Sequence, residues 1–441
     1  MPSGHAVDLD AFWLPFTPNR HFKSAPRIIA RAEGMYFYDQ SGRALLDTCS
    51  GLWCVNAGHG RRQIAEAVSR AASKLDFAPT FQFAHADAFT LAHEIAALAP
   101  QGLDHVFFVN SGSEACDTAL KIARAFHQKS GREERFRLIG RERAYHGVTF
   151  GGVSVGGIVN NRKLFGPLLP GTDDHLPLPY DRATMAYTRG QPAAGLEYAD
   201  ALESLVALRG AETIAAVIVE PFAGSAGVFA SPQGYLKRLR ELCSRHGILL
   251  IFDEVITGFG RLGAAFAAAR YGVVPDMITF AKAVTNGAVP MGGVIVSDRI
   301  HRAFEGGPDH AIELFHGHTY SAHPLACAAG LAALAIYRDE QLFERAKMSE
   351  RLLEEAAHSL KSEALVVDVR NVGMAAGIDI DPDSQSPGRR GYEAMCAAFA
   401  EEDLLVRVGG DTIALAPALV ASEDEIVRMV DGVRRVLGTL R

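Results

Sequence analysis

The chain has 441 residues, with 48% hydrophobic and 22% charged side chains and a formal net charge of −7. This length exceeds what one simple core usually supports, so two domains of ordinary globular composition are expected. The sequence contains no basic block, which argues against a nucleic-acid or anionic-membrane partner.

The first 60 residues are rich in aromatic residues, proline and glycine, and they predict an irregular N-terminal arm. Residues 1–20 lack a continuous apolar stretch, so no signal peptide is expected there. The longest apolar runs of the chain have the length of strands, so none is expected to cross a membrane. Six cysteines are scattered without a CxxC pair, which is typical of reduced thiols in a cytoplasmic protein.

Helical spacing of apolar residues over 61–75 predicts a helix, and HVFFV at 105–109 predicts a strand. The next helix is expected to begin after Ser111. Ser111 and Glu114 match a capping box, with Ser111 as N-cap and Glu114 at the third helical position.

The turn between this strand and this helix predicts an anion site. The first N–H groups of a helix have no internal partner, and the helix dipole favours anions there. Ser111 and Ser113 add hydroxyl donors, and Gly112 lets the backbone approach a ligand closely. The alternative is an ordinary helix cap. Because the chain has no GxxxxGK[ST] loop and no GxGxxG opening a helix, a small phosphorylated cofactor is favoured over a nucleotide.

A strand is expected at 136–140, and the tyrosine that follows it, Tyr145, could stack on a flat ring or simply pack in a surface loop. Residues 166–195 are rich in proline and glycine and predict a long surface loop. Strands at 213–219 and 247–252 enclose a helix at 232–245, with Ser231 as its expected cap and Gly247 at its end. Unbroken apolar strands in this order predict a parallel sheet covered on both faces.

A carboxylate and a lysine each stand at the end of an apolar stretch. Asp253 comes directly after the strand at 247–252, and Lys282 ends the next apolar stretch, among small and apolar neighbours. A buried carboxylate such as Asp253 is costly unless it is paired, and a cationic ring nitrogen is a fitting partner. A lysine can form a Schiff base. Together they are the two protein groups that pyridoxal 5′-phosphate (PLP) requires. Glu220 ends the strand at 213–219 and is expected at the same edge of the sheet.

The C-terminal part predicts an α+β unit. Its expected helices lie at 322–337, 342–360, 391–402 and 423–437, and its expected strands lie at 365–369, 375–380, 404–408 and 412–415. Just before it, His316, His318 and His323 could suggest a metal site. Because no cysteine lies in this run and no acidic residue has a clear spacing to it, we expect no metal.

The chain resembles the class III aminotransferases of the fold-type I PLP enzymes over nearly its whole length. The resemblance rests on NSGSEACDTALKIAR (110–124), RAYHG (143–147), VIVEPFAGSAG (217–227), HGILLIFDEVITGFGRLG (246–263), FAKAVTNGAVPMGG (280–293) and HGHTYSAHPLA (316–326). The segments FWLPFTPNRHFKSAPRII (12–29) and GLWCVNAGH (51–59) make it similar to the ω-amino acid:pyruvate branch, the β-alanine–pyruvate type.

The resemblance implies an α/β fold with three parts: an N-terminal arm (1–60) that packs with the small domain, a large PLP-binding domain (61–315) with a mostly parallel sheet covered by helices, and a C-terminal small α+β domain (316–441). It implies that Lys282 is the Schiff-base lysine and that Asp253 faces the pyridine nitrogen. Ser111, Gly112 and Ser113 match the phosphate loop.

The resemblance also assigns roles around the cofactor ring. Tyr145 matches the aromatic residue that stacks on one face of the ring, and Val255 matches the apolar contact on the other. His146, next to Tyr145 in the sequence, is also expected to bind the cofactor. Glu220 would help to order Asp253. Thr319 corresponds to a threonine that reaches the phosphate bound in a neighbouring subunit, which implies a homodimer with shared sites and leaves a tetramer open.

For the substrate, Arg407 matches a mobile arginine that binds a carboxylate. The expected pocket walls are Trp53, Phe16, Phe81, Phe83 and Tyr145, although Trp53 could instead be simple core packing. The sequence departs from the family pattern at Phe222, which follows the IVEP motif, and within 317–324. These departures affect the expected substrate range and leave the expected chemistry unchanged.

The implied reaction moves an amino group from an ω-amino acid or amine, such as β-alanine, to pyruvate. The products are an aldehyde or ketone and alanine. Alternatives on the same fold are an aminotransferase of the 4-aminobutyrate or diamine type, an aminomutase and a decarboxylase. A nicotinamide-dependent dehydrogenase is disfavoured by the missing GxGxxG. A non-catalytic binding protein is disfavoured by the presence of both Asp253 and Lys282.

Overall fold

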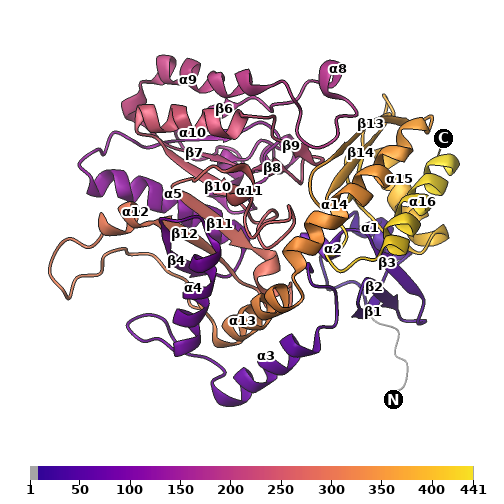
Figure 1. Ribbon diagram of the computed structural model, residues 1–441, viewed down its shortest axis with the longest axis horizontal. Coiled ribbons are helices and arrows are strands. Elements are labelled where there is room, and N and C mark those ends of the chain that lie inside the picture. Colours follow the sequence, from indigo (N-terminus) through magenta and orange to yellow (C-terminus); the bar gives the residue numbers. More distant parts are fainter. Residues whose placement is uncertain (1–7, 441) are drawn as a thin grey trace.

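The structure is a computed structural model that describes residues 8–440. The first seven residues, which belong to the segment not expected to be a signal peptide, lie outside the described part. A seven-stranded sheet dominates the fold (Figure 1). Its order is β4 (Leu103–Val109), β12 (Gly292–Ser297), β11 (Met277–Ala281), β10 (Leu249–Asp253), β7 (Ile214–Val219), β5 (Arg137–Arg141) and β6 (His175–Leu176).

This sheet is mostly parallel. The strands from β11 to β6 pair in parallel, and β12 runs antiparallel to both of its neighbours. The βαβ unit predicted between residues 213 and 252 is confirmed as β7, α10 (Tyr235–His246) and β10. The carboxyl ends of β7, β10 and β11 therefore meet at one edge of the sheet.

The central strands are apolar throughout because the sheet is covered on both faces. On β10, Leu249 and Ile251 pack against α5 (Gly112–Lys129), whereas Leu250 and Phe252 pack with α10. Successive side chains of a strand point to opposite faces, so two covered faces require an unbroken apolar run. Further helices of this part of the chain are α3 (Arg62–Lys74), α4 (Ala86–Leu98), α6 (Phe150–Val155), α7 (Val159–Arg162), α9 (Ala201–Arg209), α11 (Ala267–Tyr271) and α12 (Asp298–Arg302).

A smaller α+β unit follows, as predicted. Its antiparallel sheet has the order β13 (Val366–Asn371), β14 (Ala376–Ile380), β17 (Thr412–Leu415) and β16 (Arg407–Gly409). Its helices are α14 (Leu342–His358), α15 (Arg389–Glu401) and α16 (Glu423–Thr439). Ser422 caps α16 in a complete capping box with Glu425.

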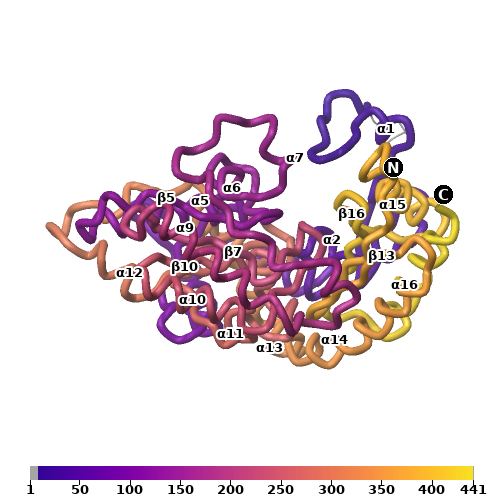
Figure 2. Tube along the Cα trace, turned by 90° about the horizontal axis from the view of Figure 1, so that it is seen from above, coloured from indigo at the N-terminus to yellow at the C-terminus, as the bar shows by residue number. Residues whose placement is uncertain are grey.

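The expectation of an irregular N-terminal arm is wrong. Strands β1 (Ile29–Glu33), β2 (Tyr36–Asp39) and β3 (Ala44–Asp47) form an antiparallel sheet, and β15 (Leu404–Leu405) joins its edge in parallel. The single strand expected at 404–408 is therefore divided between two sheets, β15 and β16. Ahead of them, α1 (Asn19–Ser24) lies next to α15 (Figure 2), where His21 Nδ1 is 2.6 Å from the hydroxyl of Tyr392.

Three local predictions need correction. The N-cap of α10 is Gly234, and the Ser231 hydroxyl donates instead to the carbonyl of Pro221. The loop expected at 166–195 contains β6 and a short helix, α8 (Arg182–Met185). The helix expected at 322–337 is present as α13 (Pro324–Asp339), but it packs mainly against α3, α4 and the 3₁₀ turn Lys282–Thr285 and not within the C-terminal unit. Within the described part of the chain, no helix combines the length and apolarity needed to cross a bilayer.

Candidate active site

A cavity of about 180 Å³ opens at the carboxyl ends of the central strands. Glu220 follows β7, Asp253 ends β10 and Lys282 follows β11, and all three line it. Gly112 and Ser113 reach it from the first turn of α5, and Tyr145 and His146 reach it from the loop after β5. The structure thus brings together most of the predicted cofactor residues from five segments that are distant in sequence.

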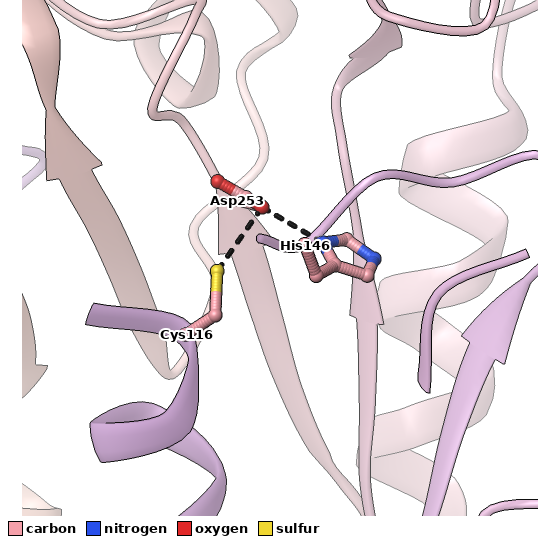
Figure 3. A group of neighbouring side chains, drawn as sticks. All are labelled: Cys116, His146 and Asp253. Carbon is pink, nitrogen blue, oxygen red and sulfur yellow. Dashed lines mark hydrogen bonds and ion pairs between the residues drawn. The ribbon is translucent and has the colours of Figure 1, made fainter. Parts of the chain in front are cut away.

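Asp253 is the best-connected group of the cavity. Its side chain is buried, and each carboxylate oxygen accepts two hydrogen bonds. Oδ2 accepts from His146 Nδ1 at 2.7 Å and from the Cys116 thiol at 3.2 Å (Figure 3). Oδ1 accepts from the Thr279 hydroxyl at 3.0 Å and from the Val255 N–H at 3.2 Å. Burial alone would raise the pKa of Asp253, but these donors, His146 above all, hold that pKa below its usual value. The group is therefore a permanent anion at the cavity wall.

Lys282 is held beside this anion by strand pairing. Asp253 on β10 is in register with Thr279 on β11, so Lys282 lies just beyond the end of the neighbouring strand. It is partly buried, and its backbone has a left-handed φ of 53°. A non-glycine residue adopts this conformation only where its surroundings hold it there. The turn directs the chain out of the strand at the point where the lysine enters the cavity.

Ser111 is confirmed as the N-cap of α5, because its hydroxyl accepts from the Glu114 N–H at 3.2 Å. The predicted capping box is incomplete, since the Glu114 side chain accepts from the Asn110 N–H and not from that of Ser111. Ser113 Oγ accepts from the Val148 N–H at 3.1 Å. A Cβ on Gly112 would lie 2.9 Å from Val255 Cγ1, so only glycine leaves room there. The first turn of the helix is thus kept open toward the cavity, although Ser111 itself does not line it.

Glu220 holds Tyr145 rather than Asp253. Its buried carboxylate accepts from the N–H groups of Tyr145 at 3.0 Å and Gly224 at 3.2 Å. Burial raises the pKa of Glu220 and also that of Tyr145. Among the described residues, the side chains that order Asp253 are those of His146, Cys116 and Thr279, together with the Val255 N–H.

Cys116 and Thr279 were not predicted as site residues, yet both touch Asp253. Only Cys116 has a signal in the sequence. Cys116 lies one helical turn after Gly112, on the face of α5 that opens on the cavity. Thr279 becomes visible only through the parallel register of β10 and β11.

A second, smaller cavity lies beside the first. It is lined by Trp53 and Arg407, together with Thr412 and the backbone of 224–227. Trp53 is buried, and its ring lies 6.2 Å from that of Phe222, which lines the main cavity. The structure therefore places Trp53 and Arg407 next to each other and next to the predicted cofactor site. Phe222, one of the departures from the family pattern, lines the main cavity and contacts Trp53, which lines the second.

Four predicted residues lie apart from both cavities. Phe16, Phe81, Phe83 and Thr319 are exposed in the single chain. In the 316–323 run, the rings of His316 and His318 lie 5.2 Å apart, and His323 makes other contacts. His316 lies 2.8 Å from the Thr118 hydroxyl, and His323 caps α13. Cys116, His146 and Asp253 have potential metal-ligand atoms within 4.8 Å of one another. The hydrogen bonds of Cys116 and His146 to Asp253 already explain why these atoms lie close together.

Comparison with known proteins agrees with this geometry. The family model of the class III aminotransferases matches residues 18–437. An omega-aminotransferase of Caulobacter vibrioides is 55% identical over 99% of both chains, and a beta-alanine–pyruvate aminotransferase of Pseudomonas aeruginosa is 48% identical over 99% of this chain and 97% of that protein. The crystal structure of a PLP-bound amine transaminase from an uncultivated Pseudomonas species is 36% identical, with a TM-score of 0.89 over 97% of this chain and 98% of that one. The predicted fold class is thereby confirmed, and the chain belongs to the class III aminotransferases.

Proposed function

We propose that this aminotransferase uses PLP to move an amino group from an ω-amino acid or amine, such as β-alanine, to pyruvate. The observation that carries the proposal is the meeting of Asp253 and Lys282 in one cavity beside an open helix N-terminus. The named activities of the similar proteins from Caulobacter and Pseudomonas support the choice of substrates.

The cavity fits a flat, phosphorylated pyridine. Gly112 leaves space where a Cβ would meet Val255, and Gly147 leaves space where a Cβ would lie within 2.4 Å of Ser113 Oγ. Asp253 lines the wall as an anion without a cationic lysine or arginine bound to it among the described residues. We infer that Asp253 binds the pyridine nitrogen, Lys282 forms the covalent link, and the turn at 111–113 binds the phosphate. Tyr145 and Val255 would cover the two faces of the ring.

When bound, PLP supplies an electron-accepting ring that stabilises negative charge on the amine-bearing carbon of the donor. Asp253 keeps a proton on the ring nitrogen, and His146 and Cys116 keep Asp253 ionised and oriented. Lys282 Nζ would act as the general base that takes the proton from the amine-bearing carbon of the donor. In the other half-reaction it would act as the general acid that delivers a proton to the α-carbon of the keto acid. Glu220 fixes the backbone of Tyr145 and so its ring.

We infer that the far end of the substrate points from the main cavity toward Arg407, at the second cavity of about 10 Å³. Arg407 is exposed on β16, where a guanidinium can bind a carboxylate of pyruvate or of an amino acid donor. Trp53 and Phe222 would form the apolar wall for the chain of the donor. An arginine on an exposed strand end can turn away when the donor has no carboxylate, which would admit simple amines.

We also infer a homodimer with shared sites. Two loops, which carry Phe77, Phe81 and Phe83 on one side and Tyr320 on the other, expose large aromatic side chains next to each other. The rings of Phe77 and Tyr320 are 6.1 Å apart. Exposed aromatic groups of this kind mark interaction surfaces. A second copy covering these loops would bring its Thr319 toward the phosphate site of its partner.

The same proposal divides the chain into the arm at 1–60, the large domain at 61–315 and the small domain at 316–441. The pairing of β3 with β15 supports contact between arm and small domain. The helix α13, which follows residue 316, packs mainly against α3 and α4 of the large domain, so contacts between the two domains would run through it.

The test is a panel of amino donors offered with pyruvate to PLP-loaded protein, with alanine as the measured product. β-Alanine, 4-aminobutyrate, putrescine and an arylalkyl amine cover the open alternatives. We expect alanine with β-alanine, and parallel double-reciprocal plots that indicate two half-reactions. Loaded protein that forms no alanine with any of these donors would refute the proposed function.

A further inference from the structure

The segment that carries Trp53 has an unusual backbone. Ser50, Gly51 and Trp53 have left-handed φ values of 48°, 66° and 64°. Glycine adopts this conformation freely, but serine and tryptophan do so only under restraint from their surroundings. The orientation of Trp53 therefore depends on the groups that hold this turn.

Asp47 provides the first restraint. Its carboxylate is buried and accepts hydrogen bonds from the N–H groups of Cys49, at 3.0 Å, and Gly51. His59 Nε2 lies 2.8 Å from the same carboxylate. Three donors on one buried acceptor fix the entry to the turn, on the side that faces the N-terminal sheet.

Arg261 provides the second restraint, from the opposite side. Its guanidinium is fully buried, and Nη2 donates to the Ser50 hydroxyl at 3.0 Å and to Asn56 Oδ1 at 2.6 Å. Nη1 donates to the carbonyls of Met374 at 3.0 Å and Pro417 at 2.6 Å. One side chain from the loop after β10 therefore binds the start of the Trp53 turn, the nearby Asn56 and two segments of the small α+β unit.

The acceptors of Arg261 are unusual for a buried cation. Within residues 8–440, all four are neutral oxygens and none is a carboxylate. Burial lowers the pKa of Arg261 to about 10, which reflects the cost of holding the charge there. Because an unsatisfied buried charge is costly, the guanidinium favours the arrangement in which these four acceptors surround it.

Trp53 links this arrangement to the substrate. Its ring is buried between Phe222 and the second cavity, which Arg407 also lines. A rotation of the turn would move the indole out of this wall. The Ser50 hydroxyl adds a further restraint, because it donates to the carbonyl of Ala416 at 2.7 Å.

We propose that Arg261 is a positioning residue that holds the strained turn at 50–53 and so sets Trp53 as the wall of the donor pocket. The inference rests on the proposed function for the role of the pocket. The geometry of the turn itself does not depend on that function.

The chain contains two tryptophans, and Trp13 is exposed whereas Trp53 is buried. In a Trp13→Phe background, Trp53 is therefore the only intrinsic indole reporter. We expect Arg261→Lys to shift its emission to longer wavelength and to raise acrylamide quenching about twofold, because one ammonium cannot reproduce the fork of Arg261. Ser50→Ala, which removes one acceptor of that fork with little change in size, should act in the same direction if Arg261→Lys fails to fold.

Arg270→Lys is the matched control. Arg270 also bridges to the small unit, through Glu350 on α14, and it donates to the carbonyl of Leu262, but none of these hydrogen bonds reaches the Trp53 turn. We expect its Trp53 emission and quenching to match the Trp13→Phe parent.

Steady-state kinetics on the PLP-loaded holoenzyme complete the test. The Arg261 and Ser50 variants should raise KM for the amino donor about tenfold while kcat changes by less than about threefold, because ground-state placement is affected more than the chemistry. Unchanged fluorescence and unchanged donor KM in a folded Arg261 or Ser50 variant would overturn the inference. If the parent itself lacks aminotransferase activity, the proposed function fails, and the fluorescence comparison still decides whether Arg261 holds Trp53.

Discussion

Replacing Asp253 by asparagine removes the anion of the cavity and changes little else in shape. An asparagine offers one acceptor oxygen where the carboxylate offers two, and each of those two now accepts two hydrogen bonds. The Val255 N–H cannot turn away, whereas His146 can change its tautomer and the Cys116 thiol can rotate. We therefore expect the amide oxygen to face Val255 and Thr279, and the amide nitrogen to face His146.

The expected cost to folding is modest and the expected cost to the reaction is large. Exchanging hydrogen bonds to a charged acceptor for neutral ones lowers stability by about 1–3 kcal/mol. An ion pair between Asp253 and a cationic ring nitrogen contributes about 4 kcal/mol at an effective dielectric constant of 20, which corresponds to about a thousandfold in rate. The variant should fold and bind PLP but react about a thousandfold more slowly.

The assay is the half-reaction with amino donor alone, followed through the visible absorbance of PLP-loaded protein. Asp276→Asn is the matched control, because Asp276 accepts from the Leu250 N–H at the opposite end of β10. It should lose stability while it keeps the wild-type rate. An Asp253→Asn protein that is loaded with PLP and reacts within about tenfold of wild type would refute the reasoning.

Three further predictions concern neighbouring groups. Gly112→Ala should push Val255 into the cavity and weaken PLP binding about tenfold in titrations of cofactor-free protein, and a second change, Val255→Ala, should restore binding. Burial raises the pKa of Glu254 from 4.5 to about 7. Between these two pH values the folded protein holds a proton on Glu254 that the unfolded chain has lost. The free energy of unfolding should therefore fall by about 3 kcal/mol as pH rises from 4.5 to 7. Urea unfolding at pH 5 and pH 8 should show this loss, and Glu254→Gln should remove it. Arg407→Ala should raise KM for pyruvate about tenfold or more and leave KM for an amine without a carboxylate nearly unchanged, and equal effects on both would contradict its role.

The central sheet and its edge were predictable because buried parallel strands leave a plain pattern. The apolar runs that end at Glu220, Asp253 and Lys282 are β7, β10 and β11, and their parallel pairing alone requires these ends to meet. The start of α5 at Ser111 was also predictable, because it depends on residues within the first turn of the helix. These features depend on neighbours within one βαβ unit or one helical turn.

Features that depend on distant partners were not predictable in this way. The N-terminal strands gain stability from pairing with one another and with β15, which lies more than 350 residues away, so their short segments looked irregular. The predicted N-cap of α10 was Ser231, but the observed one is Gly234, because the Ser231 hydroxyl donates to the carbonyl of Pro221 instead. The hydrogen bond of Cys116 to Asp253 requires knowing how α5 packs on the sheet. The roles of Phe16, Phe81, Phe83 and Thr319 stay predictions that need a second subunit.

The covalent attachment of the cofactor tests the central claim most directly. PLP-loaded protein would be reduced with borohydride, digested, and mapped by mass spectrometry, with Lys282→Ala as the control. The account predicts a pyridoxyl group on the peptide that contains Lys282 and no labelled peptide in the control. A label on a different lysine, or no label in the wild-type protein, would contradict it.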